Sequence, residues 1–273
     1  MEKSDPAVLL SYGLHLGHTK QKLHPKAKKY VYKIEKGIAI IDLFQSASFF
    51  DKAKEHLSEL GKQGKIVLFV ATKKSAKDTV RELCKENNIP YMTSKWVGGF
   101  LTNINEIFKN IKKMNQMRED RDSGVWDKLP KHERVALSKK LNRIASIYVG
   151  VEHLDKLPDA LFIIDIKKES NALKEALQTG IETIAVVDTN VNPDDVNYPI
   201  PANDDAVLSV KYIAEQAVKA YMTNFTPQSE KVNEATASIA DMKNEEKIEA
   251  ETKKIKETPT KEKVIKKKKV QKK

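Results

Sequence analysis

The chain has 273 residues, with 49 Lys and Arg against 38 Asp and Glu, so its formal net charge is +11. This surplus favours an anionic partner such as a nucleic acid. A lone cysteine excludes an intrachain disulfide, and there is neither a secretory signal nor a run of about 18 apolar residues that could span a membrane. We therefore predict a cytoplasmic protein without membrane spans.

Apolar runs alternate with helical patterns along most of the chain. The runs at 38–41, 65–70, 90–92, 160–165 and 183–187 are short and bounded by polar residues, as is typical of strands buried on both faces. Helical spacing of apolar residues predicts helices near 7–12, 49–60, 74–87, 169–179 and 207–221. The pattern predicts an α/β fold with a mainly parallel sheet flanked by helices, in a Rossmann-like three-layer arrangement.

Residues 103–150 break this alternation. Apolar residues such as Ile107 and Ile111 recur every three or four positions, a turn follows near Pro130, and the period resumes with Leu141. Two antiparallel helices packed along a narrow apolar seam fit this pattern, so we predict an inserted helical hairpin of the coiled-coil type.

The C-terminal segment differs in composition from the rest. Residues 228–273 contain 14 Lys and nine acidic residues and almost no aromatic ones, so they cannot bury enough apolar area to offset the cost of ordering. We predict a disordered basic tail there. The expected organisation is an α/β domain at 1–102 and 151–227, the hairpin at 103–150 and the tail.

A glycine pair lies where the sheet passes into the hairpin, within residues 94–103. Gly98 and Gly99 permit a sharp turn, and the large apolar residues Trp96 and Phe100 flank them. Trp96, Gly98, Gly99 and Asn103 are therefore predicted to form a joint between the domain and the hairpin.

Three groups of basic residues are candidates for phosphate contacts. The first, in a stretch that also contains Tyr30 and Tyr32, suits charge neutralisation together with stacking on bases. The second begins a helix, where the helix dipole favours anions, and the third lies on the hairpin among acidic residues. Solvated loops, helix caps and weak surface ion pairs are the alternatives. The candidates are Lys20, Lys22, His24, Lys26, Lys28, Lys29, then Lys73 and Lys74, then Lys109, Lys112 and Lys113, with Lys95 at the joint.

A divalent metal site is a further possibility. His15 and His18 are three residues apart between glycines, and Asp188 and Asp204 follow predicted strands. Imidazole and carboxylate groups together can bind a divalent ion. Histidines that hydrogen-bond to carboxylates or to the backbone are the alternative. No other cofactor is predicted.

Catalytic fingerprints are missing from the sequence. The loop after residue 70 has no glycine, so it does not match a dinucleotide site, and neither a phosphate-binding loop nor a nucleophile elbow is present. A structural protein that binds RNA is the leading interpretation. An α/β enzyme acting on a phosphorylated small molecule is the alternative.

Several segments together resemble one family, the bacterial type of small-subunit ribosomal protein S-two. The resemblance covers about residues 7–225. It is carried by motifs that occur in the family's order, at 9–18, 24–26, 95–103, 158–165, 180–181, 187–194 and 200–206. One departure from the family is Lys95, which occupies a position where the family usually has Arg. The change replaces a planar guanidinium, which can bind a phosphate through two N–H groups at once, with a single ammonium group.

The resemblance implies a non-catalytic constituent of the small ribosomal subunit. It implies an α/β domain with a protruding helical hairpin, bound to ribosomal RNA between head and body and next to other small-subunit proteins. It also implies a role in recruiting the largest small-subunit protein during translation. No membrane and no small-molecule substrate are expected.

Overall fold

The computed structural model describes residues 3–225, and the chain up to Phe225 forms one compact unit. The predicted disordered tail at 228–273 lies outside the described residues. The proposed boundaries between domain and hairpin, at 102 and 151, stay a prediction.

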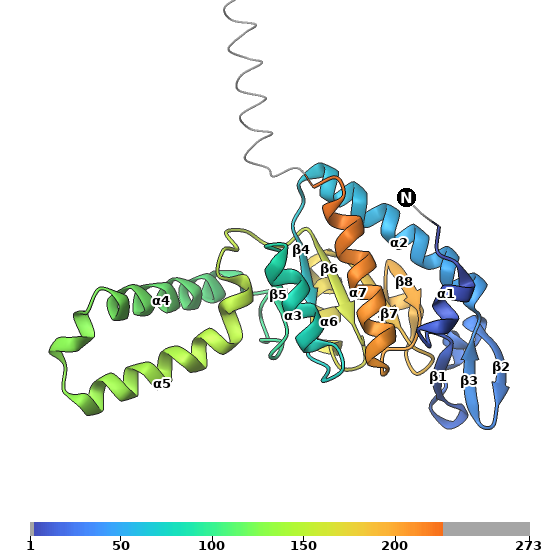
Figure 1. Ribbon diagram of the computed structural model, residues 1–273, viewed down its shortest axis with the longest axis horizontal. Helices are drawn as coiled ribbons and strands as arrows, with labels where there is room; N and C mark the ends of the chain where they lie inside the picture. Colours follow the sequence, from blue (N-terminus) through green and yellow to red (C-terminus); the bar gives the residue numbers. More distant parts are fainter. Residues whose placement is uncertain (1–2, 226–273) are drawn as a thin grey trace, which may run out of the picture. The chain divides into compact units, whose positions relative to one another are not determined.

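A five-stranded parallel sheet is the centre of this unit (Figure 1). The strand order is β5-β4-β6-β7-β8, and every neighbouring pair is parallel. Every residue of β4 and β6 is buried, as the unbroken apolar runs predict. The strands are β4 (Val67–Val70), β5 (Tyr91–Met92), β6 (Ala160–Ile164), β7 (Glu182–Val187) and β8 (Tyr198–Pro201). The prediction of an α/β fold with a mainly parallel sheet is confirmed.

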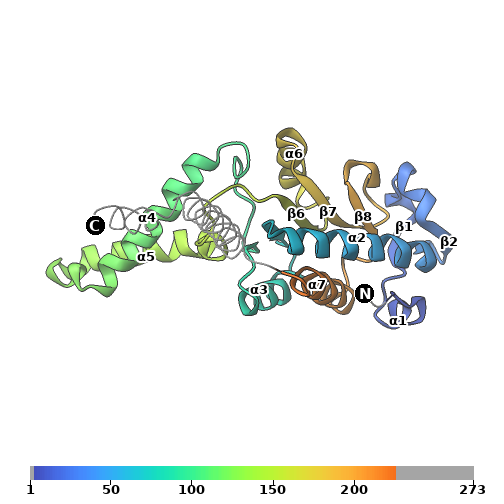
Figure 2. The ribbon, with the colours of Figure 1, turned by 90° about the horizontal axis from the view of Figure 1, so that it is seen from above.

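Helices cover both faces of this sheet. Side chains alternate along each strand, so Val67 and Phe69 pack in one apolar cluster and Leu68 and Val70 in another. The first cluster contains residues of α2, α3 and α7, and the second contains residues of α6 and of the hairpin along its length. Figure 2 shows α6 on the opposite side of the sheet from α3 and α7. These helices are α2 (Leu43–Gln63), α3 (Lys77–Glu86), α6 (Ser170–Thr179) and α7 (Val207–Met222).

The strand at Ile38–Ile41 belongs to a second sheet, and its assignment to the parallel sheet was wrong. It is β3, the middle strand of a small antiparallel sheet with the order β1-β3-β2, where β1 is Leu16–Thr19 and β2 is Val31–Glu35. Four of the five residues of β2 are exposed, so no apolar run marks it. A tight turn with positive φ at Lys36 and Gly37 connects β2 to β3.

The edge strand β8 was also absent from the sequence-based prediction. It contains Pro199 and Pro201, which cannot donate a backbone hydrogen bond. Within the described residues β8 pairs only with β7. Along its other edge no backbone N–H has to donate to a neighbouring strand, so proline is tolerated there.

The N-terminal helix α1 (Pro6–Ser11) lies close to the predicted helix at 7–12. The Asp5 carboxylate accepts a hydrogen bond from the Ala7 backbone N–H at 2.9 Å, and Pro6 occupies the first helical position.

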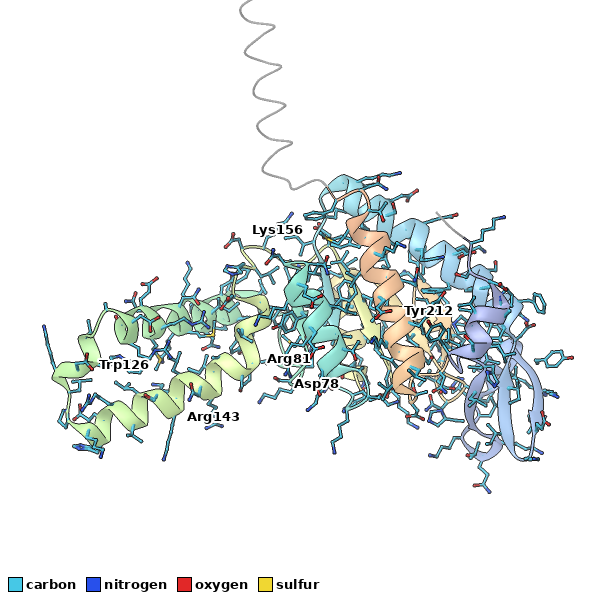
Figure 3. The ribbon with its side chains drawn as sticks, in the orientation of Figure 1. Asp78, Arg81, Trp126, Arg143, Lys156 and Tyr212 are labelled. Atoms are coloured by element: carbon cyan, nitrogen blue, oxygen red, sulfur yellow. The ribbon has the colours of Figure 1, made fainter. Side chains whose placement is uncertain are left out.

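Two long helices between β5 and β6 form the inserted hairpin. They are α4 (Ile104–Asp122) and α5 (Lys131–Tyr148), which lie side by side and are joined through the short 3-10 helix η3 (Val125–Lys128) (Figure 1). On α4 the buried residues recur at helical spacing. Trp126 of η3 is 6% exposed and closes the far end of the hairpin (Figure 3).

The remaining 3-10 helices are η1 (Lys20–Lys22), η2 (Pro25–Tyr30), η4 (Val149–Val151) and η5 (Pro193–Asp195). No helix in residues 3–225 combines the length and the apolar character that crossing a bilayer requires.

Candidate nucleic-acid interface

The chain between β1 and β2 displays a row of cations. Ala27 and Tyr30 of η2 are buried and attach the segment to the protein. The His24 imidazole accepts a hydrogen bond from the Lys26 backbone N–H at 3.3 Å, and the His24 backbone N–H donates to the Thr189 carbonyl at 2.8 Å. We call the exposed lysines of this stretch the basic segment. They are Lys20, Lys22, Lys26, Lys28 and Lys29.

Two lysines of the basic segment share one carboxylate. Asp194 Oδ1 lies 2.7 Å from Lys29 Nζ, and Asp194 Oδ2 lies 3.2 Å from Lys26 Nζ. The hydrogen bond from Lys29 lowers the pKa of Asp194, and the same contact raises the pKa of Lys29. All three side chains are exposed, so these pairs contribute little to stability. In the described part of the chain, Lys20, Lys22 and Lys28 have no ion pair.

The aromatic residues of this stretch have different environments. Tyr30 is 6% exposed and packs edge-on against Phe49, whereas Tyr32 is 72% exposed on β2. Only Tyr32 of the two is therefore accessible for stacking on a base.

Lys73 follows β4 and has an internal environment. Its Nζ lies 2.7 Å from a carboxylate oxygen of Asp204, 2.7 Å from one of Asp205 and 3.0 Å from one of Asp165. Burial opposes the charge of Lys73, but the hydrogen bonds to Asp204 and Asp205 outweigh it and raise the lysine's pKa. These contacts favour an internal role for Lys73 over the predicted phosphate contact, whereas Lys74 is exposed.

His18 extends this polar cluster at the carboxyl edge of the sheet. Its Nδ1 lies 2.8 Å from Asp188 Oδ2, and its Nε2 lies 3.0 Å from Asn190 Nδ2 and 3.4 Å from Asp205 Oδ2. The hydrogen bond to Asp188 raises the pKa of His18 despite partial burial.

The carboxylates of the cluster differ in their ionisation. Burial raises the pKa of Asp204 to about 7, and repulsion from Asp165 and Asp188 acts in the same direction. The hydrogen bond from Lys73 lowers the pKa of Asp205. Within the cluster, Asp204 is therefore harder to ionise than Asp205.

A divalent cation fits part of this cluster. Potential ligand atoms of His18, Asp188, Asp204 and Asp205 lie within 4.8 Å of one another, and one imidazole with three carboxylates is a suitable donor set. Lys73 already contacts Asp204 and Asp205 and would compete with such an ion. His15 of the predicted metal set is not in this group, which contains Asp205 besides His18, Asp188 and Asp204.

The predicted joint is organised around a residue that the sequence analysis did not select. Glu175 Oε1 accepts hydrogen bonds from the Trp96 indole N–H and from the Gly99 backbone N–H, each at 2.9 Å. Gly99 has a φ of 83°, which favours glycine, whereas Gly98 has an ordinary φ and open space around its α-carbon. The Asn103 backbone N–H donates to the Gly99 carbonyl at 2.8 Å and leads into α4.

The other predicted contacts are exposed lysines. Lys95 lies beside the joint, and Lys112 and Lys113 lie on the outer surface of α4. Lys109 Nζ forms an exposed ion pair with Glu106 at 2.6 Å.

A family model described as Ribosomal protein S2 matches residues 9–224. The chain therefore belongs to the ribosomal protein S2 family. The prediction of family membership is confirmed, and so is the prediction that this is a ribosomal protein and not an enzyme.

Curated relatives in the family have the name Small ribosomal subunit protein uS2. The relative from Helicobacter hepaticus is 36% identical over 241 residues, which cover 88% of this chain and 91% of the relative. The relative from Coprothermobacter proteolyticus is 40% identical over 214 residues, which cover 78% of this chain and 80% of the relative. The relative from Dictyoglomus thermophilum is also 40% identical over 214 residues, covering 78% of this chain and 87% of the relative.

Proposed function

We propose that this protein binds small-subunit ribosomal RNA through the basic segment, with further contacts from Lys95 and from the α4 lysines Lys109, Lys112 and Lys113. The observation that carries the proposal is the row of five exposed lysines, which Ala27 and Tyr30 hold on the protein surface. Lys20, Lys22 and Lys28, which have no ion pair in the described part of the chain, can neutralise a phosphate without losing an internal partner, whereas Lys26 and Lys29 would exchange Asp194 for it. The family and the names of the relatives supply the ribosomal context.

The position of this protein in the subunit is the second part of the proposal. As the family resemblance implies, it lies between head and body beside other small-subunit proteins, and it supports recruitment of the largest of them. Exposed apolar side chains at the starts of α2 and α7 are suited to a protein partner: Phe44 is 79% exposed and Leu208 is 61% exposed.

The test is RNA binding over a range of salt concentrations. Replacing Lys20, Lys22 and Lys28 with Gln should weaken binding to a small-subunit ribosomal RNA transcript. The salt slope is the slope of the logarithm of the binding constant against the logarithm of the salt concentration. The replacement should also lower the magnitude of this slope by about 0.7–0.9 for each phosphate that the variant no longer neutralises. The matched control replaces three exposed lysines elsewhere, Lys85, Lys174 and Lys219, with Gln. Equal slopes for both triple variants and the wild type would remove the basic segment from the interface.

A further inference from the structure

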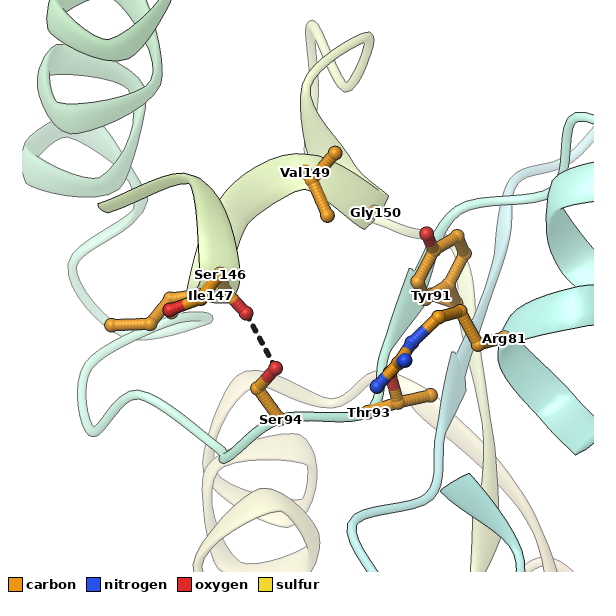
Figure 4. Close-up of a pocket in the computed structure, with 8 residues that line it drawn as sticks. All are labelled: Arg81, Tyr91, Thr93, Ser94, Ser146, Ile147, Val149 and Gly150. Atoms are coloured by element: carbon orange, nitrogen blue, oxygen red, sulfur yellow. Dashed lines mark hydrogen bonds between the residues drawn. The ribbon is translucent and has the colours of Figure 1, made fainter. Parts of the chain in front are cut away.

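A cavity of about 270 Å³ lies where the hairpin leaves the sheet domain. Its walls come from α3 and the end of β5 on one side and from the end of α5 and η4 on the other (Figure 4). The volume is near the lower end of the range of about 300–1,000 Å³ that is usual for small-molecule sites, so the cavity suits a ligand no larger than about one nucleotide. The residues that line it are Arg81, Tyr91, Thr93, Ser94, Ser146, Ile147, Val149 and Gly150.

The lining has one positive charge and no acidic side chain. The Arg81 guanidinium is loosely held: Nε donates to Thr93 Oγ1 at 3.4 Å, and Nη1 lies 3.4 Å from Asp78 Oδ1. Within residues 3–225 no hydrogen bond engages its remaining nitrogen, Nη2. A guanidinium with spare donors beside hydroxyl groups is suited to an anionic oxygen such as that of a phosphate.

The other wall is partly apolar. Figure 4 shows the Tyr91 ring beside Gly150, with Val149 on the hairpin side and the Ile147 side chain pointing away from the ring. Tyr91 is 8% exposed, so Val149 supplies most of the accessible apolar surface. A ribose or a base can pack against such a surface while its phosphate faces Arg81. Val149 is 41% exposed and lies at the edge of the cavity, so this edge is accessible from outside.

Two contacts hold the walls in place. The Ser94 hydroxyl donates a hydrogen bond to the Ser146 carbonyl, which joins the segment after β5 to the end of α5 (Figure 4). Gly150 packs against Tyr91 so closely that a Cβ at this position would overlap the Tyr91 carbonyl oxygen and approach its ring to 2.6 Å. The cavity therefore forms as part of the contact between the hairpin and the sheet domain.

We propose that this cavity binds one unpaired nucleotide of RNA, with the phosphate on Arg81 and the sugar or base against Val149 at the accessible edge. The inference rests on the proposed RNA-binding function and adds to it a second site, separate from the basic segment. Because the walls belong to two parts of the protein, a nucleotide here would bind the hairpin and the sheet domain at once.

The Arg81→Gln variant of the full chain tests whether the charge of Arg81 neutralises an RNA phosphate. The expected result is a salt slope for small-subunit ribosomal RNA that is lower by about 0.7 log units, the value for one phosphate of a single strand. The matched control is Lys85→Gln, which removes the same charge from an exposed position one turn along α3, outside the cavity. This control should keep the wild-type slope.

The space itself is tested by Val149→Trp, which fills the edge of the cavity without changing the charge. Loss of stacking or packing for one nucleotide should weaken RNA binding by about fivefold or more. Val125→Trp is the control, because Val125 is 51% exposed on η3 and lies outside this cavity. Thermal unfolding of all four variants shows whether the fold is retained.

The outcomes separate this inference from the proposed function. If the wild type binds RNA and the Arg81 and Val149 variants match their controls, the cavity does not bind RNA and the inference fails alone. If the wild type does not bind the transcript, both proposals fail. Calorimetry of the full chain with AMP, UMP and inorganic phosphate tests free ligands. Saturable binding of a mononucleotide, with RNA affinity unchanged in both variants, would assign the cavity to a free nucleotide and overturn the proposal.

Discussion

The indole N–H of Trp96 donates a hydrogen bond to Glu175 Oε1 at 2.9 Å, across 79 positions of sequence. The same carboxylate accepts the backbone N–H groups of Gly99 at 2.9 Å and of Leu101 at 3.0 Å. One side chain of α6 therefore satisfies three donors of the segment that leads from the sheet into the hairpin.

Replacing Glu175 with Ala should destabilise the protein, because three donors at the joint would lose their acceptor. We expect a loss of about 1–3 kcal/mol in the free energy of unfolding, measured in urea. The Glu175→Gln variant should lose less, because its amide oxygen can still accept hydrogen bonds. Lys174→Ala, at the exposed neighbouring position, is the control and should stay within about 0.5 kcal/mol of the wild type. An Ala variant as stable as this control would show that Glu175 does not support the joint.

The two glycines near the hairpin base should respond differently to alanine. Gly150→Ala would force a Cβ against the Tyr91 backbone and ring, so we expect a destabilisation of about 1–3 kcal/mol or more in urea unfolding. Gly98→Ala is the matched control, because a Cβ there has no heavy atom within 4 Å and φ is not positive. Similar unfolding free energies for the two variants would contradict the close packing of Gly150 on Tyr91.

The sequence predicts the parallel sheet because its strands are strongly apolar. The runs in β4, β6 and β7 have almost no alternative to burial, so their positions follow directly from hydropathy. The strands that were missed have different signals. β2 is mostly exposed, and β8 contains two prolines. The pair Lys36 and Gly37 was an available hairpin signal for β2 and β3.

In the candidate site, too, the sequence predicts exposure but not the contacts that tertiary packing creates. Exposure of the basic segment follows from its composition, since long lysine side chains are seldom buried without a partner. The surroundings of Lys73 do not follow from sequence, because Asp165, Asp204 and Asp205 reach it from other loops at the carboxyl edge of the sheet. Glu175 and Arg81 could not be selected for the same reason: their contacts depend on how helices pack on the sheet.

Lys73 should be important for stability. Lys73→Met removes the cation that lies within 3.0 Å of three carboxylates and leaves their charges uncompensated. Breaking a largely buried ion pair in this way should cost about 3–5 kcal/mol in urea unfolding at neutral pH. Lys74→Met, at the exposed next position, should be nearly neutral. If the two variants unfold alike, the Lys73 contacts do not stabilise the fold.

Tyr221 provides a prediction about alkaline pH. Its hydroxyl donates a hydrogen bond to the Lys65 carbonyl at 2.8 Å, and burial raises its pKa from 10.0 to about 12. Above pH 10 the unfolded chain loses this proton while the folded protein keeps it. The contribution of Tyr221 to the free energy of unfolding is therefore fully present below pH 10 and is lost as the pH rises towards 12. Between these two pH values the free energy of unfolding should fall by up to about 1.4 kcal/mol per pH unit, the value for one proton.

The measurement compares the wild type with Tyr221→Phe by urea unfolding between pH 8 and about pH 12. At pH 8 the variant should be less stable by about 1 kcal/mol, because one hydrogen bond is lost. As the pH rises, the difference should shrink and then reverse, since phenylalanine has no proton to retain. Other tyrosines are present in both proteins, so their titration cancels in the difference. A constant difference across this range would mean that Tyr221 titrates alike in the folded and unfolded chains, which its burial beside the Lys65 carbonyl opposes.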